Sequence, residues 1–226
     1  MVVLATKVYV RGDARERARD GLRSLVDNEL GDLDVDYTVG VRDDDFAVVT
    51  VEGDDGVAAR NLLRERFGEI TPDFRAGETY VGTLEAWDED GIVLDAGEQI
   101  RIPDAELGLG QGTPVQIVER FGLVQHTPLR FVYGGAEDGE PHRLADAERD
   151  RLYDWTRGDG RVNVNSATRA EVRATVNRAG HARDIVTVER LGLLEQSVVC
   201  KPETDPPGLL AAVGDYLPAE IRCVIP

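Results

Sequence analysis

The feature that most constrains the fold is an order of short strands and amphipathic helices that occurs at both ends of the 226-residue chain. In the first 77 residues, strand-like alternation and apolar residues at helical spacing predict strand 2–10, helix 13–30, strands 33–41 and 46–52, and helix 57–67. This β-α-β-β-α order is typical of a ferredoxin-like sandwich whose last strand is missing or is supplied by the next segment.

The last part of the chain, residues 142–226, carries the same order in complete form. Thr168 and Glu171 form a capping-box pattern that predicts the start of a helix. The expected elements are helix 145–157, strand 161–165, helix 168–179, strands 184–191 and 196–201, helix 206–216 and strand 220–225. In a ferredoxin-like sheet of order 4-1-3-2, the strands that hold Cys200 and Cys223 are not neighbours. The sequence therefore predicts two cysteines that form no disulfide.

The middle of the chain has a different pattern, without a long helical period. Short strand-like segments lie at 79–87, 91–95, 98–102, 114–120 and 129–133. This spacing predicts a small β-barrel, followed by an acidic linker at 134–141. We therefore expect an α+β protein with a ferredoxin-like domain at 1–77, a barrel at 78–135, and a helix with a second ferredoxin-like domain at 142–226.

The expected barrel resembles the S1 subclass of OB folds. The resemblance rests on four segments: Gly82-Thr83-Leu84, Gly91-Ile92-Val93-Leu94-Asp95, Ile102-Pro103 and Gly112-Thr113-Pro114-Val115. It implies an RNA-binding barrel, but S1 domains that bind RNA present aromatic and basic residues on their second and third strands. Here those strands offer aliphatic residues and a single arginine, Arg101. A structural or protein-docking barrel is the alternative.

The charge inventory is strongly one-sided. The chain holds 43 Asp+Glu against 26 Lys+Arg, with a formal net charge of -17, and only Lys7 and Lys201 are lysines. Scarce lysine with surplus carboxylate indicates a halophilic protein, since concentrated salt screens exposed charges to within about 3 Å at 1 M. No apolar run reaches the roughly 20 residues that span a bilayer. We expect a cytoplasmic protein without membrane contact.

The C-terminal part departs from this acidic average because it is locally rich in arginine. Arginine's planar fork suits phosphate and stacked bases, so these residues are candidates for nucleic-acid binding. Alternatively, they pair with Glu171, Asp184 and Glu189 on a solvated face. The candidates are Arg161, Arg169, Arg173, Arg178, Arg183 and Arg190.

A second candidate site is the unusual polar stretch Gln125, His126 and Thr127, which lies between apolar residues and before a proline. His126 could act as a general base or a metal ligand. However, no His, Cys or paired carboxylate stands at ligand spacing beside it, so we predict no metal and no cofactor. The alternative is a hydrogen-bonded histidine in a packed turn.

Residues 122–129, 190–195 and 200–202 together resemble a family of uncharacterised archaeal proteins. Genes of that family often lie near the gene for archaeal transcription factor E, which implies an association with information processing. Our leading hypothesis is a non-enzymatic accessory protein of transcription or translation. It would bind RNA or a nucleoprotein through the arginines, with a protein of that machinery as a further partner. The alternatives are a protein-interaction module and an enzyme of unknown reaction.

Overall fold

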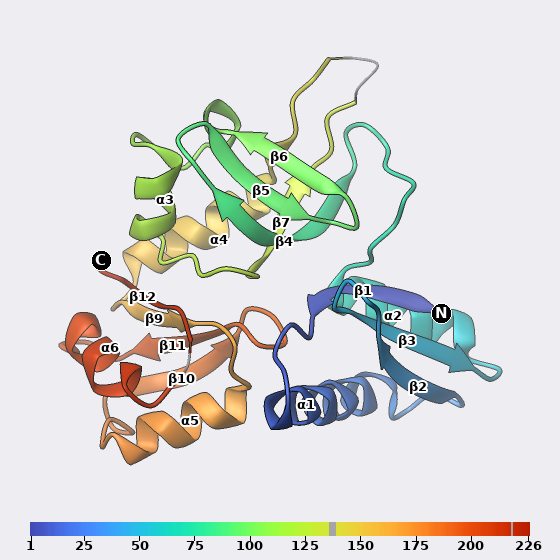
Figure 1. The fold of residues 1–226 in the computed structure, drawn as a ribbon, viewed down its shortest axis with the longest axis horizontal. Helices are drawn as coiled ribbons and strands as arrows, with labels where there is room; N and C mark the ends of the chain where they lie inside the picture. Colours follow the sequence, from blue (N-terminus) through green and yellow to red (C-terminus); the bar gives the residue numbers. More distant parts are fainter. Residues whose placement is uncertain (136–138, 218) are drawn as a thin grey trace.

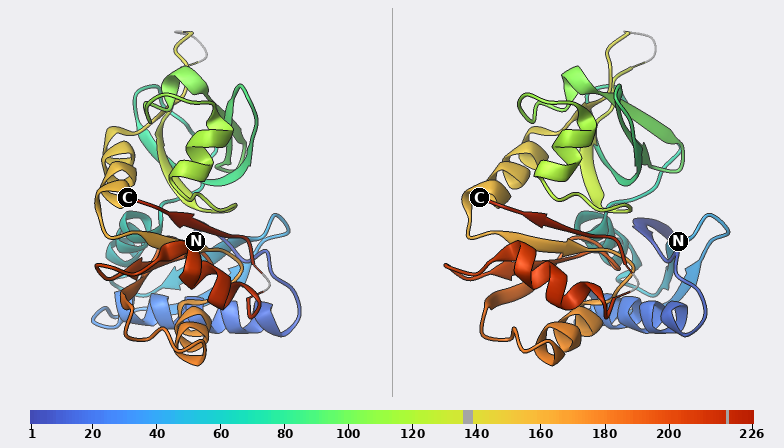
Figure 2. Two further views of the ribbon diagram at one scale, coloured as in Figure 1. Left: turned by 90° about the vertical axis from the view of Figure 1, so that its left-hand side faces the viewer. Right: turned by 60° about the vertical axis from the view of Figure 1, so that its left-hand side comes forward.

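A computed structural model describes residues 1–135, 139–217 and 219–226. Within these ranges, three antiparallel sheets and six α-helices form an α+β protein, as predicted (Figure 1). A curled sheet of five strands stands over two smaller sandwiches, one from each end of the chain (Figure 2). Residues 136–138 of the expected acidic linker lie outside the described residues.

The N-terminal sandwich has the predicted β-α-β-β-α order. Its elements are β1 (Val2–Lys7), α1 (Asp13–Leu30), β2 (Asp36–Val41), β3 (Phe46–Glu52) and α2 (Gly56–Phe67). The sheet order is β1-β3-β2. Glu69 forms an isolated antiparallel bridge with Leu4, so the segment after α2 occupies the place of a fourth strand beside β1. The domain is therefore a ferredoxin-like sandwich that lacks a full last strand.

The C-terminal sandwich is complete. Its elements are β9 (Arg161–Val164), α5 (Arg169–Arg178), β10 (Ile185–Arg190), β11 (Gln196–Cys200), α6 (Pro206–Gly214) and β12 (Ile221–Val224). The strand order β10-β11-β9-β12 is the 4-1-3-2 order expected from the sequence. Strand β9 separates the strands of Cys200 and Cys223, and both cysteines are free, as predicted.

The central sheet has the order β6-β5-β4-β7-β8 and curls into a half-barrel. Its strands are β4 (Thr79–Trp87), β5 (Gly91–Asp95), β6 (Gln99–Pro103), β7 (Pro128–Val132) and β8 (Arg143–Leu144), with a short 3-10 turn at Asp104–Glu106. Helices α3 (Pro114–Arg120) and α4 (Asp146–Arg157) cover it. Leu152 and Trp155 of α4 belong to the core of this sheet, so α4 packs with the central domain.

One predicted element is wrong: residues 114–120 form helix α3 and not a strand. The spacing of the short strand-like segments predicted a strand here, but local capping determines the helix. The Thr113 hydroxyl accepts a hydrogen bond from the backbone of Gln116, whose side chain accepts one from the backbone of Thr113. Pro114 occupies the first turn, where its missing N–H costs nothing.

Two chain segments contribute to the packing between the three domains. The turn between β10 and β11 places Leu193 and Leu194 in the core of the N-terminal sandwich. The segment after α3 contacts the C-terminal sandwich, where Asn163 Nδ2 donates to the carbonyl of Gly122 at 2.9 Å. These contacts fix the mutual placement of side chains that come from distant parts of the sequence.

Candidate functional site

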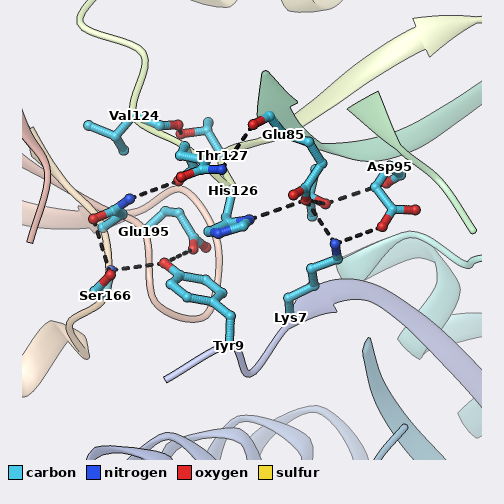
Figure 3. A network of polar contacts seen from close by, with 12 residues as sticks. Lys7, Tyr9, Glu85, Asp95, Val124, His126, Thr127, Ser166 and Glu195 are labelled. Atoms are coloured by element: carbon cyan, nitrogen blue, oxygen red, sulfur yellow. Dashed lines mark hydrogen bonds and ion pairs between the residues drawn. The ribbon is translucent and has the colours of Figure 1, made fainter. Parts of the chain in front are cut away.

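A chain of polar contacts lies where the three domains meet (Figure 3). Lys7, at the end of β1, is 8% exposed and donates to Oε1 of Glu85 at 2.8 Å and to Oδ2 of Asp95 at 2.7 Å. Both carboxylates belong to the central sheet. Lys7 therefore joins the N-terminal and central domains through a partly buried ion triplet.

His126 extends this network toward the C-terminal domain. Its Nδ1 lies 3.2 Å from Oε1 of Glu85, and its ring packs on Tyr9 with 3.9 Å between the centroids. The Tyr9 hydroxyl donates to Oε1 of Glu195 at 2.7 Å and accepts a bond from the Ser166 backbone N–H at 2.9 Å. Hence one continuous set of contacts reaches from Asp95 and Lys7 to Glu195 (Figure 3). We call these residues the junction network.

The backbone is held in an uncommon conformation at two points of the junction network. His126 has φ of 67° and Ser166 has φ of 57°, both in the left-handed region that non-glycine residues seldom adopt. The His126 backbone N–H donates to the carbonyl of Leu84 at 2.6 Å, which anchors the turn to β4. Such backbone strain persists only where surrounding contacts determine it.

The two glutamates of the junction network experience opposite environments. Burial opposes ionisation of Glu85, but hydrogen bonds from His126 and Lys7 outweigh it and lower the pKa of Glu85 to about 2. Burial raises the pKa of Glu195 to about 8, even though Tyr9 donates to it. Glu195 is 1% exposed, and its Oε2 has no hydrogen-bond partner among the described residues. Burial thus favours the protonated form of Glu195, whereas its partners favour the ionised form of Glu85.

The predicted polar stretch belongs to the junction network, and all three of its side chains are engaged there. Gln125 Nε2 donates to the carbonyl of Glu85 at 2.9 Å, and the Thr127 hydroxyl donates to the carbonyl of Val124 at 2.7 Å. His126 contacts Glu85 and Tyr9 as described above. The contacts made by Gln125, His126 and Thr127 hold the turn against its neighbours.

The hairpin turn between β10 and β11 links the junction network to a second feature. It begins at Arg190 and ends at Glu195. A Cβ on Gly192 would collide with Oε2 of Glu195 and press on the ring of Pro128, so a larger residue there would force these side chains to shift. The structure thus brings together the two segments, 122–129 and 190–195, that are conspicuous in the sequence.

On the far side of this turn, arginines from all three domains line a cleft. Two adjoining pockets of about 540 Å³ and 500 Å³ share Arg66, Arg151, Arg190 and Leu191. Four carboxylates also border them: Glu65, Glu69, Asp154 and Glu189. We name this feature the arginine cleft, and its arginines are Arg64, Arg66, Arg130, Arg151, Arg161, Arg169 and Arg190.

Three of the six predicted arginines, Arg161, Arg169 and Arg190, line the arginine cleft. The other three, Arg173, Arg178 and Arg183, are exposed and line neither pocket. The expected pairing with acidic neighbours holds for Arg161, which forms an ion pair with Glu189. In contrast, Glu171 pairs with Arg17 of the N-terminal domain at 2.6 Å, and Asp184 pairs with His181 at 2.7 Å.

Four arginines of the cleft were missed by sequence reasoning. Arg64 and Arg66 lie on α2, Arg130 on β7 and Arg151 on α4. Along the chain they are scattered among carboxylates, and no local pattern distinguishes them from surface residues. Their proximity depends on how the domains pack.

Ion pairing differs among the cleft arginines. Arg130 and Arg151 both reach the fully buried carboxylate of Glu148, and Arg66 pairs with Glu29 at 3.0 Å. Arg190 forms no ion pair within the described residues. Partial burial and the like charges of Arg169 and Arg66 lower its pKa. The cleft thus contains an arginine on which the charges of Arg169 and Arg66 act repulsively.

Two classes of site are not found in the part of the chain that the structure describes. No group of His, Cys, Asp and Glu side chains there is arranged to hold a metal ion. None of the described helices is long and apolar enough to cross a membrane.

The fold and the site define an α+β protein of three domains that meet at a buried polar network and enclose an arginine-lined cleft. Family models match almost the whole chain. The DUF2110 N-terminal domain matches residues 1–73, the DUF2110 central domain matches 74–156 and the DUF2110 C-terminal domain matches 159–225. The chain belongs to the DUF2110 family. No curated protein matches it.

Proposed function

We propose that this protein binds RNA in the arginine cleft, as an accessory protein of transcription or translation. The observation that carries the proposal is the convergence of seven arginines from three domains on one cleft, in a chain of net charge -17. Arginine presents five donors in a rigid fork that matches phosphate oxygens. Carboxylates elsewhere on the surface repel a polyanion and favour the cleft as its point of contact.

The dimensions of the cleft favour a single strand over a duplex. Its two pockets of about 540 Å³ and 500 Å³ are of the size that holds small ligands. A splayed strand can place separate phosphates in adjoining pockets, whereas a rigid duplex contacts a broad surface. The proposed ligand is therefore single-stranded RNA.

The central domain offers a second possible RNA-binding surface, the outer face of its barrel, but this face is less suited to RNA than the arginine cleft. We propose that it is an S1-like OB domain, because its strands run in the order 3-2-1-4-5 of the domain with α3 between the third and fourth. OB folds bind oligonucleotides on the face of strands 2 and 3. The outward face of these strands holds the pair Val93 and Arg101, and Arg101 is already engaged by Asp88 at 2.6 Å.

The assignment to transcription or translation rests on the archaeal family resemblance. An interaction module without RNA contact is the main alternative, since the same cleft would accept an acidic protein segment. The enzyme alternative would require free reactive groups in the junction network. It is less well supported because Gln125, His126 and Thr127 are all engaged in contacts that hold the turn.

We expect the double substitution Arg66→Gln/Arg190→Gln to weaken binding of a labelled single-stranded RNA by about tenfold or more, since each charged hydrogen bond contributes about 1.5–3 kcal/mol. The slope of log affinity against log salt should fall by about 0.7 for each phosphate that the variant no longer neutralises. Fluorescence anisotropy at the lowest KCl concentration that keeps all variants folded measures both quantities.

The matched control is Arg173→Gln/Arg178→Gln, which changes the net charge equally on an exposed helix face outside the cleft. We expect its affinity to stay close to that of the wild type. Equal weakening by both double variants would show a diffuse charge effect. No binding by the wild type would leave the interaction module as the better account.

We further propose that the acidic surface adapts the protein to concentrated salt. With 43 carboxylates, repulsion grows as the Debye length rises from about 3 Å at 1 M to about 30 Å at 0.01 M salt. We expect the melting temperature, followed by circular dichroism, to rise by several degrees from about 0.1 to about 2 M KCl. A melting temperature that is constant over this range would contradict the proposal.

A further inference from the structure

Arg66, Arg169 and Arg190 stand out within the arginine cleft because two of them, Arg169 and Arg190, form no ion pair with any carboxylate of the described residues. All three line the same pocket of about 500 Å³. The charges of Arg169 and Arg66 are the electrostatic influences that lower the pKa of Arg190. Holding like charges together costs free energy, and a bound anion would offset that cost.

Each of the three guanidinium groups keeps donors available. Nε of Arg169 donates to the carbonyl of Val188 at 2.6 Å, and Nε of Arg66 lies 3.0 Å from Oε1 of Glu29. Both contacts engage Nε and leave the terminal nitrogens of the two side chains for a ligand. Arg190 uses none of its donors in an ion pair within the described residues.

The carboxylates that border this pocket are already engaged. Glu189 pairs with Arg161, and Asp154 lies 3.4 Å from Arg157. Neither therefore neutralises Arg190. The position of Arg169 is itself fixed, because Thr168 and Glu171 form the capping box that starts α5 and Glu171 is held by Arg17.

We infer that Arg66, Arg169 and Arg190 form a phosphate-binding subsite that spans the N-terminal and C-terminal domains. The subsite rests on the proposed function, in which an RNA phosphodiester supplies the phosphate, but free phosphate has the same chemistry. Because Arg66 comes from α2 and the other two from the C-terminal sandwich, a bound phosphate bridges two domains. It also binds only the native arrangement and therefore stabilises the fold.

The test uses the full chain and inorganic phosphate at constant ionic strength, with KCl as the balancing salt. We expect phosphate to raise the melting temperature of the wild type and of the control variant Arg178→Gln. Arg190→Gln should weaken phosphate binding, measured by isothermal titration calorimetry, about tenfold, as expected for loss of a charged hydrogen bond. Arg190→Lys should recover part of the affinity, since it keeps the charge and loses the fork.

Equal phosphate affinity in the wild type and Arg190→Gln, or no phosphate binding by the wild type, overturns the subsite. A parallel titration with single-stranded RNA separates this failure from failure of the proposed function. If the wild type binds RNA but Arg190→Gln does not change the affinity for phosphate, the proposed function is retained and the subsite is rejected. If phosphate binding depends on Arg190 and RNA binds no more tightly than inorganic phosphate, the subsite is retained and its ligand is free phosphate.

Discussion

Replacing Lys7 with methionine is expected to lower the free energy of unfolding by about 3 kcal/mol, as found when one partner of a buried ion pair is removed. Lys7 is 8% exposed, and its Nζ lies between two carboxylates, 2.8 Å from Oε1 of Glu85 and 2.7 Å from Oδ2 of Asp95. Without the ammonium group, two carboxylates face each other at the contact between the N-terminal and central domains. Urea denaturation measures the change.

Lys201→Met is a natural control, since Lys7 and Lys201 are the only lysines of the chain. Lys201 is exposed, and its Nζ donates to the carbonyl of Arg183. We expect its replacement to change stability by less than about 0.5 kcal/mol. In addition, Lys7→Met/Glu85→Gln should be less destabilised than the sum of the single variants, because it removes the repulsion. Equal denaturation midpoints for Lys7→Met and Lys201→Met would contradict the structural role of the triplet.

The second large effect concerns Glu195, whose pKa of about 8 lies above its unfolded value near 4.5. Between these values the unfolded state loses a proton that the native state retains, so stability falls as pH rises from about 4.5 to 8. We expect Glu195→Gln to remove this dependence, since glutamine keeps an acceptor for the Tyr9 hydroxyl and never ionises. The free energy of unfolding of Glu195→Gln, relative to that of the wild type, should increase by roughly 2 kcal/mol or more between about pH 5 and 8.

The control Glu89→Gln replaces an exposed glutamate at a turn and should leave the pH profile unchanged. Denaturation at several pH values gives the comparison. Parallel profiles for the wild type and Glu195→Gln would show that Glu195 does not hold its proton in the native state.

Glu85 acts with the opposite sign: its pKa of about 2 adds stability that is present above pH 4.5 and lost as pH falls toward 2.

Prediction from the sequence succeeded where the determining interactions are local. Alternation and helical spacing located the strands and helices of both sandwiches. Thr168 and Glu171 marked the start of α5, where the capping box is present. The same kind of local signal is present at Thr113 and Gln116, where the barrel spacing predicts a strand and the chain forms α3. Here capping outweighed β-propensity, because propensity differences are small and depend on context.

Candidate residues were predictable only in part. The stretch from Gln125 to Thr127 was conspicuous because polar side chains interrupt an apolar segment. Yet its partners Glu85 and Tyr9 lie 40 or more positions away in the sequence. In the same way, the arginine-rich C-terminal part indicated three residues of the cleft and three that lie outside it. A local count of charge does not show which face a side chain occupies.

The sequence by itself determined the α+β class, the 4-1-3-2 order of the C-terminal sheet and the free cysteines, because these follow from short-range periodicity and from the standard topology of one motif. Only the tertiary structure decided where the charges meet. Arg66 and Arg190 become neighbours, and Glu195 becomes a buried acid, because the turn of the β10–β11 hairpin inserts Leu193 and Leu194 into another domain's core. Such nonlocal packing depends on surfaces assembled from the whole chain, which no segment of sequence specifies alone.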